Sequence, residues 1–170
     1  MILVTVGTHD QGFDRLVRSM DQLAIQFDER VIIQRGSSTY RPRYAEHFRF
    51  TTNQKMTNLI QEARVVVCHA AAGAIILSLN YGKPLVLVPR LRKFGEHLDD
   101  HQLELAQALD DAKMAIAVYD TAGATLQQAI HMAGRRKMER AGSGQLVNTL
   151  RRQLQEWASI EDHRTGILRG

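Results

Sequence analysis

Five short runs of apolar residues, rich in valine and isoleucine, constrain the fold of this chain more than any other feature of its sequence. They are ILVTV (2–6), VIIQ (31–34), VVVC (65–68), LVLV (85–88) and AIAV (115–118). The runs do not alternate apolar with polar residues, which is the pattern of strands that are covered on both faces and therefore of a parallel sheet. A further segment, HFRFTT (47–52), predicts a short sixth strand.

Segments between these runs carry apolar residues at helical spacing. They predict helices over 13–24, 56–63, 98–109 and 126–132, and a helical pattern that ends at Gly82. Strands that alternate with helices imply crossover connections. We therefore expect an α/β fold: a single, Rossmann-like, doubly wound parallel sheet of about six strands.

The end of the chain carries a basic cluster over 135–140, followed by a stripe of Leu146, Leu150, Leu154 and Trp157. The stripe predicts a last helix, which we expect to pack within the domain rather than against a partner. We expect the domain to cover residues 1–157 and residues 158–170 to form a flexible tail.

Composition restricts the function classes. The length of 170 residues, with 44% apolar and 24% charged residues, fits one globular domain. The net charge of +4 and the 6% of aromatic residues fall short of a nucleic-acid-binding surface, so we expect no nucleic-acid partner. A single cysteine excludes an intrachain disulfide and fits a cytoplasmic protein. No stretch approaches the roughly 20 apolar residues that span a bilayer.

Polar and small residues gather in the loops that follow the predicted strands. These loops are GTHDQG (7–12), RGSSTYR (35–41), HAAAG (69–73) and PRLRKFGEHLDDHQ (89–102). Because ligands of open parallel sheets bind at the carboxyl ends of the strands, we expect the site there. Helix N-termini after Gly7 and Ala70 would direct backbone N–H groups at an anion such as a diphosphate. Neither G-x-G-x-x-G nor G-x-x-x-x-G-K-[ST] occurs, which argues against NAD binding and P-loop chemistry but leaves other nucleotide sites open.

Several loop residues allow two interpretations. His9, beside Asp10 and near Asp14, could act as a general base or have no role. His69 could line a pocket or only bind backbone groups. Arg90 and Arg92 could neutralise a diphosphate or be solvated loop cations.

His97 and His101 have the spacing of a helical zinc pair. Because no third His or Cys follows at a set spacing, we expect no metal.

Four motifs, in order and at matching spacing, resemble a known family: VTVGTHDQGFDRLV, QRGSS, MTNLIQEARVVVCHAAAGAIILSLNYGKPLVLVPR and FGEHLDDHQLELA. They are similar to the donor-binding, C-terminal-type half of family 28 glycosyltransferases. Within that family they most resemble the small soluble subunits of two-component exopolysaccharide transferases, and more distantly the soluble subunit that makes dolichol-linked chitobiose.

The resemblance implies one half of a GT-B fold that binds a UDP-sugar as donor substrate, with no cofactor. It implies the subunit of an inverting transferase that adds a hexose to a lipid-linked oligosaccharide in exopolysaccharide synthesis. A membrane-associated acceptor-binding subunit would be the partner and would recruit this chain to the inner face of the cell membrane. Homo-oligomerisation stays open. His9 is the candidate catalytic residue, and the candidate substrate-binding residues are Gly7, Thr8, Arg35, Gly36, Ser37, His69, Ala70, Ala72, Gly73, Ala74, Arg90, Glu96, His97, Asp100, His101 and Gln102.

The chain departs from the family pattern in the loop after VVVC. Relatives commonly have HAGAGT or HAGAGS, with a Glu three residues after the Thr or Ser, where this chain has Ala71, Ala74 and Leu77. A hydroxyl expected near the diphosphate and a carboxylate expected at the ribose are therefore absent. The alternative function is a catalytically degenerate regulatory or scaffold subunit with the same fold.

Overall fold

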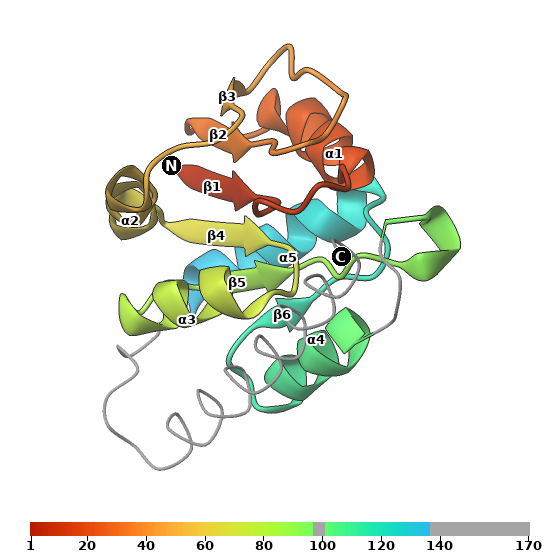
Figure 1. The fold of residues 1–170 in the computed structure, drawn as a ribbon. Coiled ribbons are helices and arrows are strands. Elements are labelled where there is room, and N and C mark those ends of the chain that lie inside the picture. The colour runs from red at the N-terminus through yellow and green to blue at the C-terminus, as the bar shows by residue number, and fades with distance from the viewer. Residues whose placement is uncertain (97–100, 137–170) are drawn as a thin grey trace.

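The structure is a computed structural model, and it describes residues 1–96 and 101–136, with the side chain of residue 101 excepted. Six strands form one sheet in the order β3-β2-β1-β4-β5-β6 (Figure 1). The strands are β1 (Ile2–Thr5), β2 (Val31–Gln34), β3 (Glu46–Phe48), β4 (Val65–Cys68), β5 (Leu85–Leu87) and β6 (Ile116–Ala117).

Every pair of neighbouring strands is parallel, which confirms the predicted doubly wound sheet. Ile2 of β1 lies in register with Val31 of β2 on one side and with Val65 of β4 on the other. The order reverses beside β1, because the chain first adds β2 and β3 on one side and then β4, β5 and β6 on the other. The carboxyl ends of β1 and β4 therefore lie at the switch point of the sheet, which is where the ligand crevice is expected in such folds.

Helices cover both faces of the sheet (Figure 1). Helices α1 (Asp14–Ala24) and α5 (Gly123–Arg135) pack on the face that carries Ile2 and Val4. Helices α2 (Asn53–Glu62), α3 (Ala72–Asn80) and α4 (His101–Asp111) pack on the face that carries Leu3 and Val66. Two apolar cores thus enclose the strands, as the unalternating apolar runs require.

Local sequence explains two helix boundaries. Thr52 caps α2 by accepting a hydrogen bond from Lys55 N, at 3.3 Å, so α2 starts earlier than its apolar spacing predicted. Gly82, with φ of 62°, follows the end of α3 and donates its N–H to Leu79 O.

The helix predicted over 13–24 forms as α1, which begins at Asp14, and residues 6–13 form the loop between β1 and this helix. The helix N-terminus expected after Gly7 is therefore the start of α1, beyond that loop. The predicted last helix with Trp157, and the tail over 158–170, lie outside the described residues. Of the helices over 1–96 and 101–136, none is long and apolar enough to cross a membrane.

Candidate functional site

Gly7 and His69 lie in contact where β1 and β4 end. Gly7 has φ of 75°, and a Cβ at this position would lie 2.5 Å from His69 Cε1. His69 is buried, and its backbone N–H donates to Thr5 O at 3.3 Å. The imidazole ring therefore occupies the space that any other residue at position 7 would need, and glycine is required there by both backbone conformation and packing.

The loop that follows β2 packs tightly on the same glycine. Gly36 has φ of 53°, and a Cβ there would lie 2.8 Å from Gly7 O. Gln34 Nε2 donates to Gly7 O at 3.0 Å, and the Thr5 hydroxyl donates to Gln34 Oε1. These bonds satisfy buried polar groups and fix the position of the first loop against the second.

Ser38 and Arg35 hold the second loop against the start of α1. Ser38 Oγ accepts a hydrogen bond from Phe13 N at 2.8 Å, and Arg35 Nη1 donates to Ser38 O at 2.8 Å. Phe13 N is one of the N–H groups that the start of α1 would otherwise leave without a partner. Ser38 thus satisfies the N–H of the N-cap residue, although the first turn of α1 itself has no side-chain cap, and Arg35 acts within its own loop.

The start of α3 also lacks a side-chain cap. Ala71 is its N-cap residue and offers no side chain to the first turn, so the first described helical bond runs from Ile75 N to Ala71 O. Gly73 is exposed, and a Cβ there would have no atom within 4 Å. The N–H groups of the first turn, with the partial positive charge of the helix N-terminus, thus have no side-chain cap. This arrangement suits a phosphate or diphosphate group.

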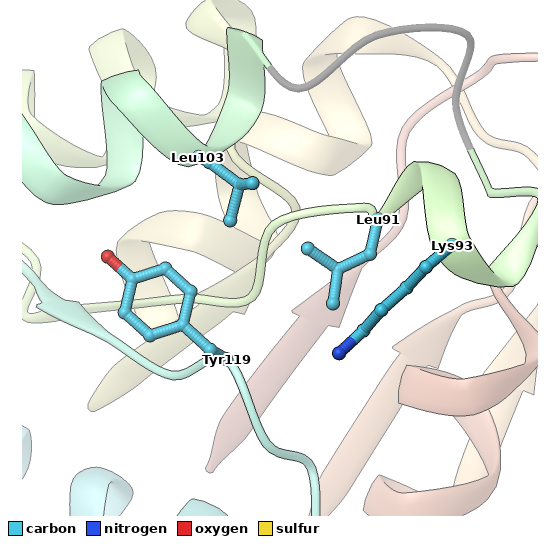
Figure 2. A pocket seen from close by; sticks show the side chains of 4 residues that line it. All are labelled: Leu91, Lys93, Leu103 and Tyr119. Atoms are coloured by element: carbon cyan, nitrogen blue, oxygen red, sulfur yellow. The ribbon is translucent and has the colours of Figure 1, made fainter.

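A hollow of about 280 Å³ lies further along the same edge, between the loop after β5, α4 and the segment after β6 (Figure 2). Its lining consists of Leu91, Lys93, Leu103 and Tyr119. The Tyr119 hydroxyl donates to Gln107 Oε1 at 2.9 Å, which fixes the ring at the rim. The hollow is mainly apolar with one cation, and none of these four residues was a predicted site residue.

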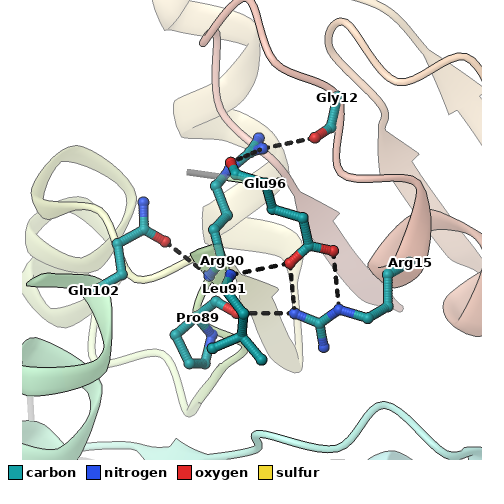
Figure 3. A network of polar contacts seen from close by, with 7 residues as sticks. All are labelled: Gly12, Arg15, Pro89, Arg90, Leu91, Glu96 and Gln102. Atoms are coloured by element: carbon teal, nitrogen blue, oxygen red, sulfur yellow. Dashed lines mark hydrogen bonds and ion pairs between the residues drawn. The ribbon is translucent and has the colours of Figure 1, made fainter. Parts of the chain in front are cut away.

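Arg90 joins the loop after β5 to the loop after β1 (Figure 3). Its side chain is 1% exposed, and its Nη atoms donate to Gly12 O at 2.8 Å, Val6 O at 3.0 Å and Glu96 O at 3.3 Å. The guanidinium also lies 4.7 Å from the centre of the Phe13 ring. These contacts make Arg90 a buried crosslink between loops, so it is not a solvated loop cation, and its contact with a diphosphate stays a prediction.

Glu96 forms the second half of this network. Its carboxylate receives two hydrogen bonds from Arg15, at 2.8 Å and 2.9 Å, and one from Leu91 N at 3.0 Å. Gln102 Oε1 accepts from Arg90 N at 3.1 Å. Glu96 and Gln102, which were predicted to bind the donor substrate, are both buried. In the structure their side chains accept hydrogen bonds from the backbone of the loop after β5.

Burial affects the ionisation of two groups. It lowers the pKa of Arg90 to about 10, although nearby Glu96 acts in the opposite direction. Arg90 is therefore still charged at neutral pH. Burial raises the pKa of the Cys68 thiol at the end of β4 to about 12, so Cys68 is a buried apolar residue and not a nucleophile.

His9 lies on the exposed part of the first loop, and its Nδ1 accepts a hydrogen bond from Gln11 N at 3.1 Å. In the neutral ring this bond places the proton on Nε2. Asp14 accepts hydrogen bonds from the Thr39 hydroxyl and from Tyr40 N. A general base at His9 would therefore require the release of Gln11 N, either to free Nδ1 or to let the proton move from Nε2 to Nδ1.

The remaining candidates divide into two groups. Those near the crevice are Thr8 and Ser37, in the first and second loops, and Ala70, Ala72 and Ala74, around the start of α3. His97 and Asp100 lie outside the described residues, and the side chain of His101 is not described. Within the described residues no group of His, Cys, Asp or Glu could hold a metal ion.

Sequence reasoning missed Thr5, Gln34, Arg15 and Ser38 as residues that shape the site. Gln34 could have been identified, because a polar residue at the end of an apolar strand predicts a buried hydrogen bond. Arg15 offered none, because its partner Glu96 is 81 residues away along the chain.

Comparison with known families gives one match, which covers most of the chain. The model of the glycosyltransferase family 28 C-terminal domain matches residues 1–154. A curated relative is the human UDP-N-acetylglucosamine transferase subunit ALG13, which is 34% identical over 120 residues. The match covers 64% of this chain but only 10% of the human protein, so this chain corresponds to a small part of that relative.

Solved structures resemble the fold. The glycotransferase of kitacinnamycin superposes with a TM-score of 0.62 at 19% identity, over 92% of this chain and 39% of that one. The NMR solution structure of ALG13 superposes with a TM-score of 0.55 at 16% identity, over 82% of this chain and 87% of that one. At these identities the likeness concerns the fold alone.

Proposed function

Because this chain belongs to the glycosyltransferase family 28 C-terminal domain family, we propose that it is the donor-binding subunit of a two-component glycosyltransferase. Its fold is one half of the GT-B architecture of the solved neighbours, and it covers 39% of the first of them. The active site of a GT-B enzyme lies between two halves. In this proposal a separate, membrane-associated polypeptide supplies the acceptor half.

The uncapped start of α3 beside the Gly7–His69 contact is the observation that supports donor binding. Its N–H groups would bind the diphosphate of a UDP-sugar without a metal or cofactor. The human relative is named as a UDP-N-acetylglucosamine transferase subunit, which supports a UDP-sugar as the donor class.

The family resemblance implies an inverting transfer. A hydroxyl of the acceptor attacks C1 of the donor sugar, on the face opposite the diphosphate. The bond between C1 and the diphosphate oxygen breaks, UDP leaves with the bonding electrons, and a base takes the hydroxyl proton. The start of α3 would stabilise the charge that develops on the leaving diphosphate. His9, or a residue of the partner, would be the base.

We further propose a hexose as the transferred sugar, a lipid-linked oligosaccharide as the acceptor, and exopolysaccharide synthesis as the process. These assignments rest on the resemblance of the four sequence motifs to small subunits of two-component exopolysaccharide transferases. The chain would then work in the cytoplasm, at the inner face of the membrane, where its partner holds the lipid-linked acceptor.

A scaffold subunit is the second candidate, favoured by one observation. The start of α3 carries Ala71, Ala74 and Leu77, so neither a hydroxyl nor a carboxylate is available there. A lost hydrogen bond to a charged group weakens binding by about 1.5–3 kcal/mol, which would weaken a donor site without abolishing it.

Calorimetric titration with UDP and a panel of UDP-sugars separates the two candidates. Saturable binding of one UDP-sugar, by the chain alone or with its partner, is the result expected for a donor-binding subunit. If no UDP-sugar of the panel bound to the chain, either alone or with its partner, the scaffold would be favoured. Efficient transfer to a lipid acceptor by the purified chain alone would contradict the two-component arrangement.

A further inference from the structure

The hollow beside Tyr119 has the size and lining of a site for a protein side chain. Figure 2 shows Leu91, Leu103 and Tyr119 around a common space, with Lys93 beside it. Its volume of about 280 Å³ falls below the roughly 300–1,000 Å³ of pockets that enclose free ligands. One large aromatic side chain would occupy much of this volume.

Charges of both signs surround the hollow. Lys93 is the cation of its lining. Burial raises the pKa of the Tyr119 hydroxyl, and so do Asp110 and Asp111, which shows that two carboxylates lie near the Tyr119 wall. A neutral, apolar occupant therefore suits the hollow better than an anion or a cation.

The edge of the sheet next to the hollow is open in the part of the chain that the structure describes. Strand β6 pairs only with β5, and Ile116 and Ala117 of β6 are both half-buried. Tyr119 follows this strand by two residues. Proteins commonly cover such an edge with a helix or a loop, which satisfies or shields its unpaired backbone groups.

The end of this chain carries a segment that matches this surface. Leu146, Leu150, Leu154 and Trp157 lie outside the described residues, and their spacing predicts an apolar stripe along one side of a helix. Such a stripe needs an apolar surface to cover it. Trp157 is the only tryptophan of the chain and the largest side chain of the stripe.

The described part of the chain ends where this segment can reach both the edge and the hollow. Arg136 follows α5, and its Nη1 donates to Ala115 O at 3.0 Å, so the end of α5 lies beside the start of β6. From Ala115 to Tyr119 an extended backbone advances about 13 Å. The linker 137–145 can span about 30 Å, and a helix over 146–157 would be about 18 Å long.

We propose that residues 146–157 run along the open edge of β6 and that the Trp157 side chain occupies the hollow. The occupant is then this chain itself. The residues after Trp157 would leave the domain at the carboxyl edge of the sheet, and the hollow would be a packing site rather than a ligand site. The inference depends only on the hollow and this segment, so it stands or falls independently of the transferase proposal.

The lining matches the chemistry of an indole ring. Leu91, Leu103 and the ring of Tyr119 supply apolar contact, and the Lys93 ammonium would lie over the indole face, where a cation is attracted. The Tyr119 hydroxyl donates its proton to Gln107 Oε1, so its oxygen keeps lone pairs that could accept the indole N–H. Both the apolar and the polar parts of the ring would therefore be satisfied.

Fluorescence of the purified full chain tests the proposal, because all tryptophan emission comes from Trp157. We expect blue-shifted emission and weak quenching by acrylamide, both independent of protein concentration. Leu103→Asp should shift the emission to the red and lower the ratio of docked to free Trp157 by about tenfold or more. Leu103 is half-buried, so a folded variant is expected, and circular dichroism checks it.

Leu59→Asp is the matched control. Leu59 is also a half-buried leucine of a helix on the same face of the sheet, but it belongs to α2, which precedes β4. The control should leave Trp157 emission unchanged. Tyr119→Ser removes another wall of the hollow at a side chain that is 39% exposed, so it should give the same red shift even if Leu103→Asp does not fold.

Several results would overturn the proposal. One is the emission of a solvent-exposed tryptophan in the unaltered chain. Another is buried emission that neither Leu103→Asp nor Tyr119→Ser changes, or that the folded control changes equally. Emission that shifts on dilution would assign the bound tryptophan to a second copy of the chain and would also contradict it. UDP titration of the same variants keeps the donor site as a separate readout.

Discussion

Replacing Arg90 with methionine separates a structural role from a ligand role at the centre of the site. Methionine keeps much of the apolar volume but leaves the carbonyl groups of Val6, Gly12 and Glu96 without the guanidinium donor. Each buried carbonyl that loses its partner costs about 1–3 kcal/mol, or about 3–9 kcal/mol for the three. The substitution also removes the cost of burying a charge, which is evident in the lowered pKa of Arg90 and offsets a few kcal/mol.

We therefore expect Arg90→Met to lower the free energy of unfolding by about 3 kcal/mol, near the lower end of the range for breaking a buried charged contact. In a domain of this size that corresponds to a fall of about 6–12 °C in Tm. Arg92→Met is the matched control, because Arg92 is exposed and its loss should change stability by less than about 0.5 kcal/mol.

Thermal unfolding and UDP titration of both variants distinguish a structural role of Arg90 from a direct contact with the diphosphate. An unchanged Tm for Arg90→Met, together with a loss of UDP binding, would refute the structural role and restore the direct diphosphate contact predicted from sequence. A lower Tm with UDP affinity that recovers at low temperature would support the crosslink between loops.

Four further predictions concern ionisation and the donor site. Although burial raises the pKa of Asp21, backbone N–H groups and the Tyr40 hydroxyl hold it below its ordinary value, so its contribution is present at neutral pH and is lost as pH falls from about 5 to 2. Asp21→Asn should cost about 2–4 kcal/mol at pH 7 and remove part of that acid sensitivity, as measured by urea unfolding across pH. Cys68, with a pKa of about 12, should resist iodoacetamide at pH 8 until urea unfolds the chain, and rapid native labelling would contradict its burial. Ala74→Thr/Leu77→Glu should tighten UDP binding by about tenfold or more if the start of α3 holds the nucleotide, whereas unchanged affinity in a folded variant would place the nucleotide elsewhere. Transfer by the complex with its partner should persist in EDTA, and its abolition with rescue by one divalent ion would overturn metal-free diphosphate binding.

The sheet could be predicted from sequence because its signal is local and repeated. Each apolar run became a strand: β2 and β4 have the predicted bounds, whereas β1, β5 and β6 are shorter than their runs, and Val6, Val88 and Val118 are buried just beyond the strand ends. The sixth strand was predicted over 47–52 and lies at Glu46–Phe48, because an edge strand pairs on one side only and its ends carry little signal. Helix α5 extends beyond its predicted range because its flanking alanine and glycine residues add no apolar periodicity.

The site could be predicted only in outline. The rule that ligands bind at the carboxyl ends of parallel strands located the correct loops. The roles of individual residues depend on contacts distant in sequence, such as Arg90 with Val6 across 84 residues, and no local pattern carries that information. The same limit applies to Gly7, since the contact of its backbone with His69 appears only in three dimensions.

The buried polar groups around the first loop would be needed by an enzyme subunit and by a scaffold. Gln34 binds Gly7 O from the β2 side, and Arg90 binds Val6 O and Gly12 O from the β5 side. The acceptors are backbone carbonyl groups, which apolar side chains cannot satisfy, so any folded form of the chain benefits from these bonds. The choice between the two functions therefore depends on the start of α3, where Ala74 and Leu77 offer no polar contact. UDP titration of Ala74→Thr/Leu77→Glu tests that choice at the residues on which it depends.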